Sequence, residues 1–259
     1  MNDLIRTIRA RESTRTRFDQ RRRVDSEKVK MIIEAARWAP TPHNMQNFEI
    51  VAVDDPELLR EIGGVKSRTS EGFIRENYEQ LSFSRRELSE KRVGILGEYF
   101  PPEWRNPATF ASAARNTPPR PLSDMIDGSP LVMIVLYDPD RRAPASEGDF
   151  LGIMGLGCVM ENMWLMATAL GLGVQVMSVF GGSDVGKSIG RILGVPASKR
   201  IAYALRLGYP AHELEDYPRV RRESDSMSYH NGYGTAHQGL HSLRESGRRQ
   251  DRTQSTRPP

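Results

Sequence analysis

Cysteine is almost absent from this chain: Cys158 is the single example among 259 residues. A disulfide framework within one chain is therefore excluded, and a reducing compartment is expected. The N-terminus also lacks the apolar segment of a secretion signal. Cys158 itself lies in an apolar stretch with no histidine nearby, which favours core packing over a nucleophilic role. We therefore expect a cytoplasmic protein.

Two common binding signatures are missing as well. No Gly-x-Gly-x-x-Gly follows a predicted strand, so a Rossmann dinucleotide site is not supported. His230, His237 and His241 are too loosely spaced to predict a metal site, and no metal is expected. The net charge of +4 is modest and its arginines concentrate at the two ends. Such a distribution suits anionic small ligands as well as nucleic acid.

The longest apolar stretch is DFLGIMGLGCVMENMWLMATALGLGVQVMSVF, residues 149–180. Its first two thirds are apolar on nearly every side, which predicts a helix buried all round. Glu161 and Asn162 in its middle argue against a membrane span. Glycines at 152, 155 and 157 indicate close approach of another backbone. Gly171 and Gly173 end the helix, and GVQVMSV then reads as a strand.

Other elements follow from periodicity and from proline and glycine. Residues 2–10 predict an amphipathic helix that turns Leu4, Ile5 and Ile8 inward. A second helix begins at Asp25 or Ser26 and ends before Pro40. Further helices are expected at ELLREI, at SRRELSEKRVGILGEYF and at SDVGKSIGRILG. Strands are expected at FEIVAV, SPLVMIVLYD and RIAYALRLGYP.

Two polar patterns indicate a binding site. Arg11, Ser13 and Arg15 alternate, so an extended backbone would point all three the same way and form a receptor for phosphate or carboxylate. A solvated basic segment is the alternative, and it is preferred if the pattern is taken alone. A second polar group, TPHNMQ, lies between a helix end and a strand. It fits ordinary turn chemistry, but the amides of Asn44 and Gln46 could also serve the donors and acceptors of a planar heterocycle.

The order and spacing of four segments resemble the flavin-dependent nitroreductase family. They are RESTRTRF, EAARWAPTPHNMQNFEIVAV, the glycine-ended helix with GLGVQVMSVF, and LRLGYP. The resemblance covers roughly residues 4–64 and 128–222. It implies an α+β fold with a central, mainly antiparallel sheet flanked by helices. It also implies an interlocked homodimer with FMN held non-covalently between the subunits.

The resemblance assigns twelve residues to the cofactor. Arg11, Ser13 and Arg15 match the element on the FMN phosphate and ribityl chain, and Arg219 and Arg221 match a C-terminal element that closes on the phosphate. The remaining positions match groups near the flavin ring: Thr41, Pro42, Asn44, Gln46, Val176, Met177 and Ser178. In the family, the turn at Thr41 and Pro42 touches the flavin from the partner subunit.

The chain departs from the family pattern in three places. Ser178 and Val179 stand where some members carry Glu-Gly, and Asn47 replaces a frequent proline. One extra residue separates Arg15 from Phe18. These differences leave FMN binding expected but leave the subfamily open.

The resemblance implies an FMN-dependent oxidoreductase. Such an enzyme takes hydride from NADH or NADPH and reduces a nitroaromatic or quinone-like small molecule by a ping-pong mechanism. The flavin N5 carries the chemistry, so no protein residue is assigned as catalytic. One alternative is different flavin chemistry: flavin fragmentation, reductive dehalogenation, or oxidation of a peptide or specialised metabolite. A remote alternative is nucleic-acid binding by the Arg-rich tail, although no nucleic-acid or membrane partner is expected.

The predicted domain organisation is simple. Residues 1–222 form one FMN-binding domain, with an insertion over about 65–127 that covers the flavin and shapes the substrate pocket. The insertion could instead be a surface addition whose aromatic residues pack beneath it. Residues 223–259 have few apolar side chains and are expected to form a flexible polar tail.

Overall fold

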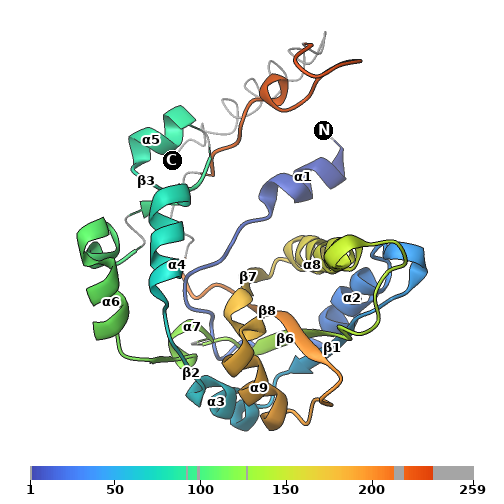
Figure 1. Ribbon diagram of the computed structural model, residues 1–259. Helices are drawn as coiled ribbons and strands as arrows, with labels where there is room; N and C mark the ends of the chain where they lie inside the picture. The colour runs from blue at the N-terminus through green and yellow to red at the C-terminus, as the bar shows by residue number, and fades with distance from the viewer. Residues whose placement is uncertain (1, 92, 98–99, 127, 213–218, 236–259) are drawn as a thin grey trace, which may run out of the picture. The chain divides into compact units, whose positions relative to one another are not determined.

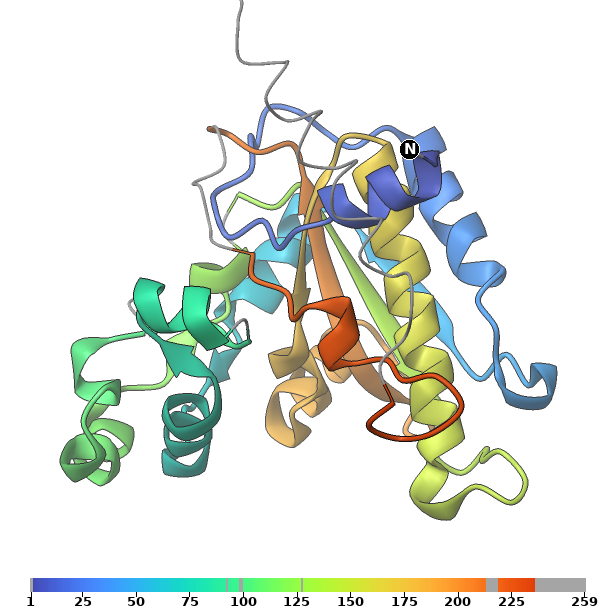
Figure 2. The ribbon, with the colours of Figure 1, turned by 90° about the horizontal axis from the view of Figure 1, so that it is seen from above.

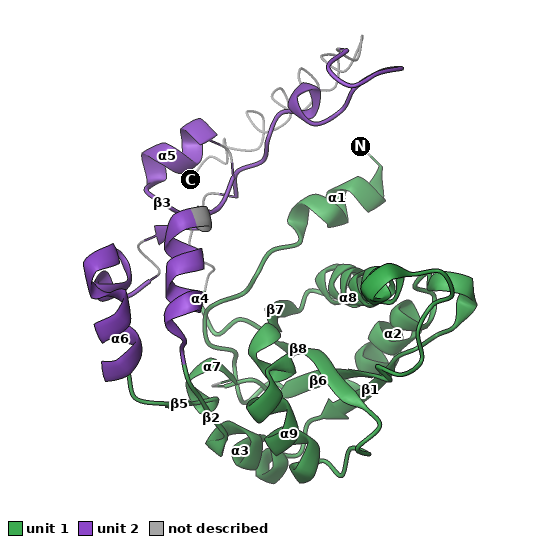
Figure 3. Cartoon of the chain, viewed as in Figure 1, with its two compact units in different colours: residues 1–68, 117–215 green, residues 69–116, 216–259 purple. Residues whose placement is uncertain are grey.

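The computed structural model describes residues 2–91, 93–97, 100–126, 128–212 and 219–235. The chain divides into two compact units (Figure 3). Unit 1 consists of residues 1–68 and 117–215, and unit 2 of residues 69–116 and 216–259. The predicted insertion over about 65–127 contains the first segment of unit 2.

The centre of unit 1 is a four-stranded sheet in the order β1-β6-β8-β7. Its strands are β1 (Glu49–Val53), β6 (Leu131–Tyr137), β7 (Gly173–Met177) and β8 (Arg200–Gly208). Every neighbouring pair is antiparallel. Six of the seven residues of β6 are buried, which confirms the strand predicted from its continuous apolar run. The α+β class and the antiparallel sheet are confirmed.

Helices cover both faces of this sheet (Figure 1). On one face lie α2 (Ser26–Arg37) and α8 (Phe150–Ala169), which run side by side along the sheet (Figure 2). On the other lie α3 (Pro56–Gly64), α7 (Ser123–Ile126) and α9 (Ser183–Ile192). Alternate residues of β6 face the two layers, since Met133 packs with the α2–α8 layer and Ile134 with the α3–α9 layer.

Helix α8 ends as predicted, because Gly171 adopts a positive φ of 73° at the turn into β7. The predicted burial all round is wrong for a single chain. Phe150, Ile153 and Met154 are 64%, 60% and 52% exposed, and a Cβ on Gly157 would have no neighbour within 4 Å. One face of α8 packs on the sheet and on α2, and the opposite face is left open.

The inward orientation expected of the N-terminal helix is also wrong for a single chain. Helix α1 spans Asp3–Ala10, and Leu4, Ile5 and Ile8 are all exposed. In length and composition alone, one helix of the described residues, Glu147–Ala169, could cross a membrane. This helix is the predicted core helix, and its packing on α2 and on the sheet accounts for the buried share of its apolar side chains.

The smaller elements of unit 1 connect these layers. They are the short helical turns Pro42–Asn44, Glu147–Asp149 and Ser178–Gly181, and the two-residue strands β2 (Lys66–Ser67) and β5 (Arg120–Pro121), which pair with each other.

Unit 2 is built from short elements around a small core of Ile74, Phe110 and Ala113. Its elements are α4 (Glu71–Glu76), the π-helical turn Asn77–Leu81, β3 (Ser82–Phe83), α5 (Arg85–Lys91), β4 (Ile95–Leu96), the turns Pro102–Trp104 and Pro107–Thr109, α6 (Phe110–Asn116) and the turn Ser224–Ser226. The helix predicted over residues 84–100 is too long. It stops at Lys91, and Gly94 then takes a positive φ of 88° before β4 begins.

Candidate functional site

The N-terminal segment lies against the start of β7. Ser13 pairs with Val174, the backbone N–H of Thr14 donates to the Val174 carbonyl at 2.8 Å, and the Val174 N–H donates to Thr14 Oγ1 at 3.2 Å. Thr14 and Phe18 are buried, whereas Arg15 and Arg17 are exposed. From Thr14 to Phe18 the side chains therefore alternate as on an extended backbone, whereas Arg11 caps the end of α1.

Arg11, at the end of α1, contacts α8 rather than β7. Its Nε lies 3.3 Å from Glu161 Oε1, and its guanidinium carbon lies 4.5 Å from the centroid of the Trp164 ring. The indole N–H of Trp164 donates to the Glu12 carbonyl at 3.3 Å. Helix α8 thus holds both the side chain of Arg11 and the backbone beside it.

The end of β7 completes this side of unit 1. Val176 is half-buried, Met177 is buried, and Ser178 is exposed where the strand passes into a helical turn. Six predicted site residues therefore lie on β7, on the turn after it, or on the N-terminal segment beside its start. We call them the β7-edge group: Arg11, Ser13, Arg15, Val176, Met177 and Ser178.

The other predicted ring-binding residues lie in the turn between α2 and β1. His43, Asn44 and Gln46 all have positive φ values, of 50°, 51° and 45°. Non-glycine residues in this conformation cost about 1–3 kcal/mol each, and such strain concentrates at functional sites. Gln46 Nε2 donates to Asn44 Oδ1 at 3.1 Å, and the Gln46 N–H donates to Thr41 Oγ1 at 3.1 Å. We call Thr41, Pro42, Asn44 and Gln46 the β1-edge group.

Two neighbours fix the position of this turn. A Cβ on Gly155 of α8 would lie 3.2 Å from Pro42 Cδ, so the absence of a side chain at Gly155 lets the turn pack closely against the helix. The side-chain amide of Asn47 donates to the carbonyls of Asp138 and Arg141 at 2.9 and 2.7 Å, and its Oδ1 accepts from the Asp138 N–H at 3.1 Å. Asn47, which replaces the frequent proline, therefore ties the turn to the end of β6.

A single copy does not bring the two groups together. Strands β1 and β7 are the opposite edges of the sheet, and three inter-strand steps of about 4.8 Å separate them. Arg219 and Arg221 belong to unit 2, where both are exposed and Arg221 Nη1 donates to the Val220 carbonyl at 2.7 Å. Their approach to Arg11 and Arg15 stays a prediction.

Sequence reasoning missed a buried polar pair beneath the N-terminal segment. Arg206 of β8 is 4% exposed, and its Nε donates to Oε1 of Gln175, the facing residue of β7, at 2.8 Å. Its Nη2 donates to the carbonyls of Thr14 and Thr16 at 3.1 and 2.9 Å. The sequence carries a signal for it, because an arginine within the apolar strand IAYALRLG needs buried partners.

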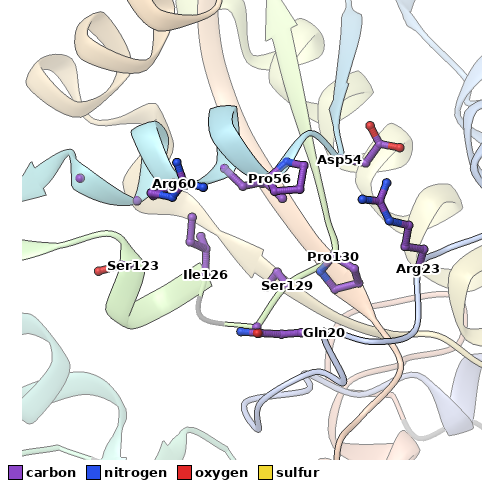
Figure 4. A pocket seen from close by; sticks show the side chains of 13 residues that line it. Gln20, Arg23, Asp54, Pro56, Arg60, Ser123, Ile126, Ser129 and Pro130 are labelled. Atoms are coloured by element: carbon purple, nitrogen blue, oxygen red, sulfur yellow. The ribbon is translucent and has the colours of Figure 1, made fainter.

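A pocket of about 640 Å³ lies elsewhere in unit 1 (Figure 4). It is lined by Gln20, Arg23, Asp54, Pro56, Leu59, Arg60, Gly63, Gly64, Ser123, Ile126, Gly128, Ser129 and Pro130. In Figure 4, Arg23 and Asp54 lie at the same end of this pocket. None of the twelve predicted cofactor residues lines it, so we do not assign the cofactor there.

No metal centre is built from the described residues, among which no group of three His, Cys, Asp or Glu side chains could hold an ion. His237 and His241 lie outside the described residues.

The fold is that of an α+β protein whose extended N-terminal segment lies beside its antiparallel sheet. The family model for nitroreductases matches residues 8–209. The chain belongs to the nitroreductase family.

Individual relatives are distant but span nearly the whole chain. A protein of Archaeoglobus fulgidus, whose name assigns it to the NADH dehydrogenases/NAD(P)H nitroreductases, is 23% identical over 217 residues, which is 84% of this chain and 91% of the relative. A Bacteroides fragilis nitroreductase structure with bound FMN is 19% identical with a TM-score of 0.52, covering 92% of this chain and 100% of that one. A Desulfitobacterium hafniense nitroreductase structure with bound FMN is 18% identical with a TM-score of 0.55, covering 89% and 99%. These structural likenesses establish the shared fold.

Proposed function

We propose that this protein is an FMN-dependent oxidoreductase. It takes hydride from NADH or NADPH and reduces a nitroaromatic or quinone-like acceptor by a ping-pong mechanism. The observation that supports this most is the N-terminal segment, which pairs with the start of β7 and exposes Arg15 and Arg17. Family membership and the FMN in the two related structures support the same assignment.

The chemistry of the residues present fits FMN. Arg11, Ser13 and Arg15 offer guanidinium and hydroxyl donors to a phosphate monoester, with Arg219 and Arg221 as further candidates. Asn44 and Gln46 offer amide donors and acceptors to the polar edge of a flavin ring. Both amide side chains are exposed in a single chain and are held together by their mutual hydrogen bond. Bound FMN would supply the redox chemistry, accepting hydride from the nicotinamide and delivering electrons to the acceptor.

We further propose a homodimer with one FMN site at each junction between subunits. The β7-edge group of one copy would then meet the β1-edge group, Thr41 and Pro42 included, of the other. The open faces of α1 and α8 support this arrangement, because exposed apolar side chains gather there: Leu4, Ile5, Ile8, Phe150, Ile153 and Met154. Monomeric proteins seldom expose large apolar patches to water.

The role of the protein's own residues is binding and exclusion. The arginines hold the phosphate and take no part in hydride transfer, and the amides of the strained turn orient the ring. Closure of a second copy over the apolar faces would keep water from the ring. A cytoplasmic location and a small-molecule acceptor accord with this function.

The test begins with the colour and visible absorbance of the purified protein. Anaerobic addition of NADH or NADPH should bleach the flavin bands, and a nitroaromatic should restore them, with parallel double-reciprocal plots at varied acceptor. If the protein binds FMN but neither nicotinamide bleaches it within minutes, this reaction is wrong and the alternative flavin chemistry takes its place.

A further inference from the structure

We infer that Arg206, together with Gln175, is a positioning residue for the N-terminal segment that carries Ser13 and Arg15. The inference rests on the proposed function, because it concerns residues that we assign to the FMN phosphate. Arg206 would not touch the cofactor itself. It would act through the backbone on which Ser13 and Arg15 are carried.

The backbone of the N-terminal segment is attached to the sheet near both of its ends. Its backbone pairs with β7 at Ser13 and Thr14, and its far end bonds to the chain after β8 through Asp19 N–H to Tyr209 at 2.8 Å and Ala211 N–H to Arg17 at 2.9 Å. Between these points the carbonyls of Thr14 and Thr16 accept from Arg206. Buried backbone carbonyls need such partners, and here a side chain takes the place of a neighbouring strand.

The guanidinium of Arg206 holds the middle of this segment to the sheet. Its Nε is bound to Gln175 and its Nη2 bridges two carbonyls that flank Arg15. The guanidinium carbon also lies 4.8 Å from the centroid of the Phe18 ring. A planar guanidinium that is held by several partners at once fixes the position of the backbone carbonyls it binds.

Two glycines leave room for the side chains beneath the segment. Gly173 and Gly208 face each other across β7 and β8. A Cβ on Gly173 would lie 2.8 Å from both Thr14 Oγ1 and Phe18 Cε1, and a Cβ on Gly208 would lie 2.8 Å from Phe18 Cγ. The two glycines therefore leave room for the buried side chains of Thr14 and Phe18. The alternate residues of the segment, Ser13 and Arg15, then lie on its opposite side.

The experiment titrates apo-protein with FMN and with riboflavin and compares the ratio of their dissociation constants. Riboflavin lacks the phosphate, so this ratio reports the phosphate contacts alone. In Arg206→Lys the charge remains, but a single ammonium cannot span Gln175 and both carbonyls. We expect the preference for FMN to fall by on the order of tenfold, the equivalent of one charge-assisted hydrogen bond. Gln175→Ala should reduce the preference less.

Two controls keep the result interpretable. Arg191→Lys, an exposed position on α9, should keep the wild-type ratio, and circular dichroism of each apo-protein checks that it is folded. If Arg206→Lys does not fold, Gln175→Ala decides. An unchanged ratio in the folded variants overturns the inference, even if both ligands bind more weakly. A wild-type protein with no preference for FMN contradicts the proposed function instead.

Discussion

Glu161, the single charged residue of α8, places its Oε1 3.3 Å from the Nε of Arg11. The same helix receives Pro42 against Gly155, which precedes Glu161 by six residues. Helix α8 thus contacts residues of both predicted groups, Pro42 at Gly155 and Arg11 at Glu161. Its open face is also where we place the second copy.

The first prediction concerns that face. Gly157→Leu would add a side chain where the single chain has open space, so it should leave the fold intact and obstruct the partner. Light scattering should show dissociation, accompanied by loss of FMN. Gly64→Leu is the matched control, because a Cβ at Gly64 also has no neighbour within 4 Å. A stable, yellow and active wild-type monomer would refute the dimeric site.

The second prediction concerns Gly155, whose substitution should act on the turn at Pro42 and not on the contact between subunits. Gly155→Leu would collide with Pro42 within its own chain and displace the strained turn. It should therefore reduce FMN affinity even at protein concentrations where the dimer persists. FMN titration of a preparation shown to be dimeric measures this, and an unchanged affinity would remove the turn from the site.

The third prediction concerns Asn47, whose side chain makes three hydrogen bonds to the backbone after β6. Asn47→Ala leaves those backbone groups without their partner and should lower the free energy of unfolding by about 2–3 kcal/mol. Urea unfolding of the apo-protein measures the loss. Asn116→Ala, an exposed position of unit 2, should change it little. An equal effect of the two substitutions would show that Asn47 does not hold the turn.

The fourth prediction concerns pH. Tyr203 is buried, and its hydroxyl donates to the Leu156 carbonyl at 3.0 Å. Burial raises the pKa of Tyr203 above its ordinary value. The neutral form is favoured in the folded state, so this stabilisation is complete below about pH 10 and declines as the pH rises further. Tyr203→Phe should lower stability by about 1 kcal/mol at pH 7. The difference from wild type should shrink at higher pH, and a constant difference would contradict the burial of this hydroxyl.

The fifth prediction addresses the acceptor. In unit 2, Trp104 stacks near Phe100 at 5.9 Å between ring centroids and meets Phe73 edge-on at 6.0 Å. If these rings bind an aromatic acceptor, Trp104→Leu should raise its KM by about three- to tenfold. Reduction by NAD(P)H should be unaffected, and Tyr233→Leu, a highly exposed position, is the control. Equal KM values would place the acceptor elsewhere.

The sequence predicted the main elements of unit 1 because their periodicities are strong. The apolar run of β6 and the glycine after α8 each specify one local outcome. Inward or outward orientation was less predictable, since Leu4 and Phe150 are apolar yet exposed in one chain. We propose that a second copy covers them. Arg206 was missed because its partners, Thr14 and Thr16, are distant in the sequence and are bound through backbone carbonyls, which carry no pattern.

We propose that arginines from both ends of the predicted domain hold one phosphate. Titration of apo-protein with FMN and riboflavin tests it most directly, in wild type, Arg11→Ala and Arg221→Ala. Each charge-assisted bond is worth about 1.5–3 kcal/mol, so each substitution should weaken FMN binding about ten- to a hundredfold. Lysine at either position should restore affinity only in part, and riboflavin should bind all the proteins weakly and alike. Equal FMN affinity in wild type and both alanine variants would contradict the account.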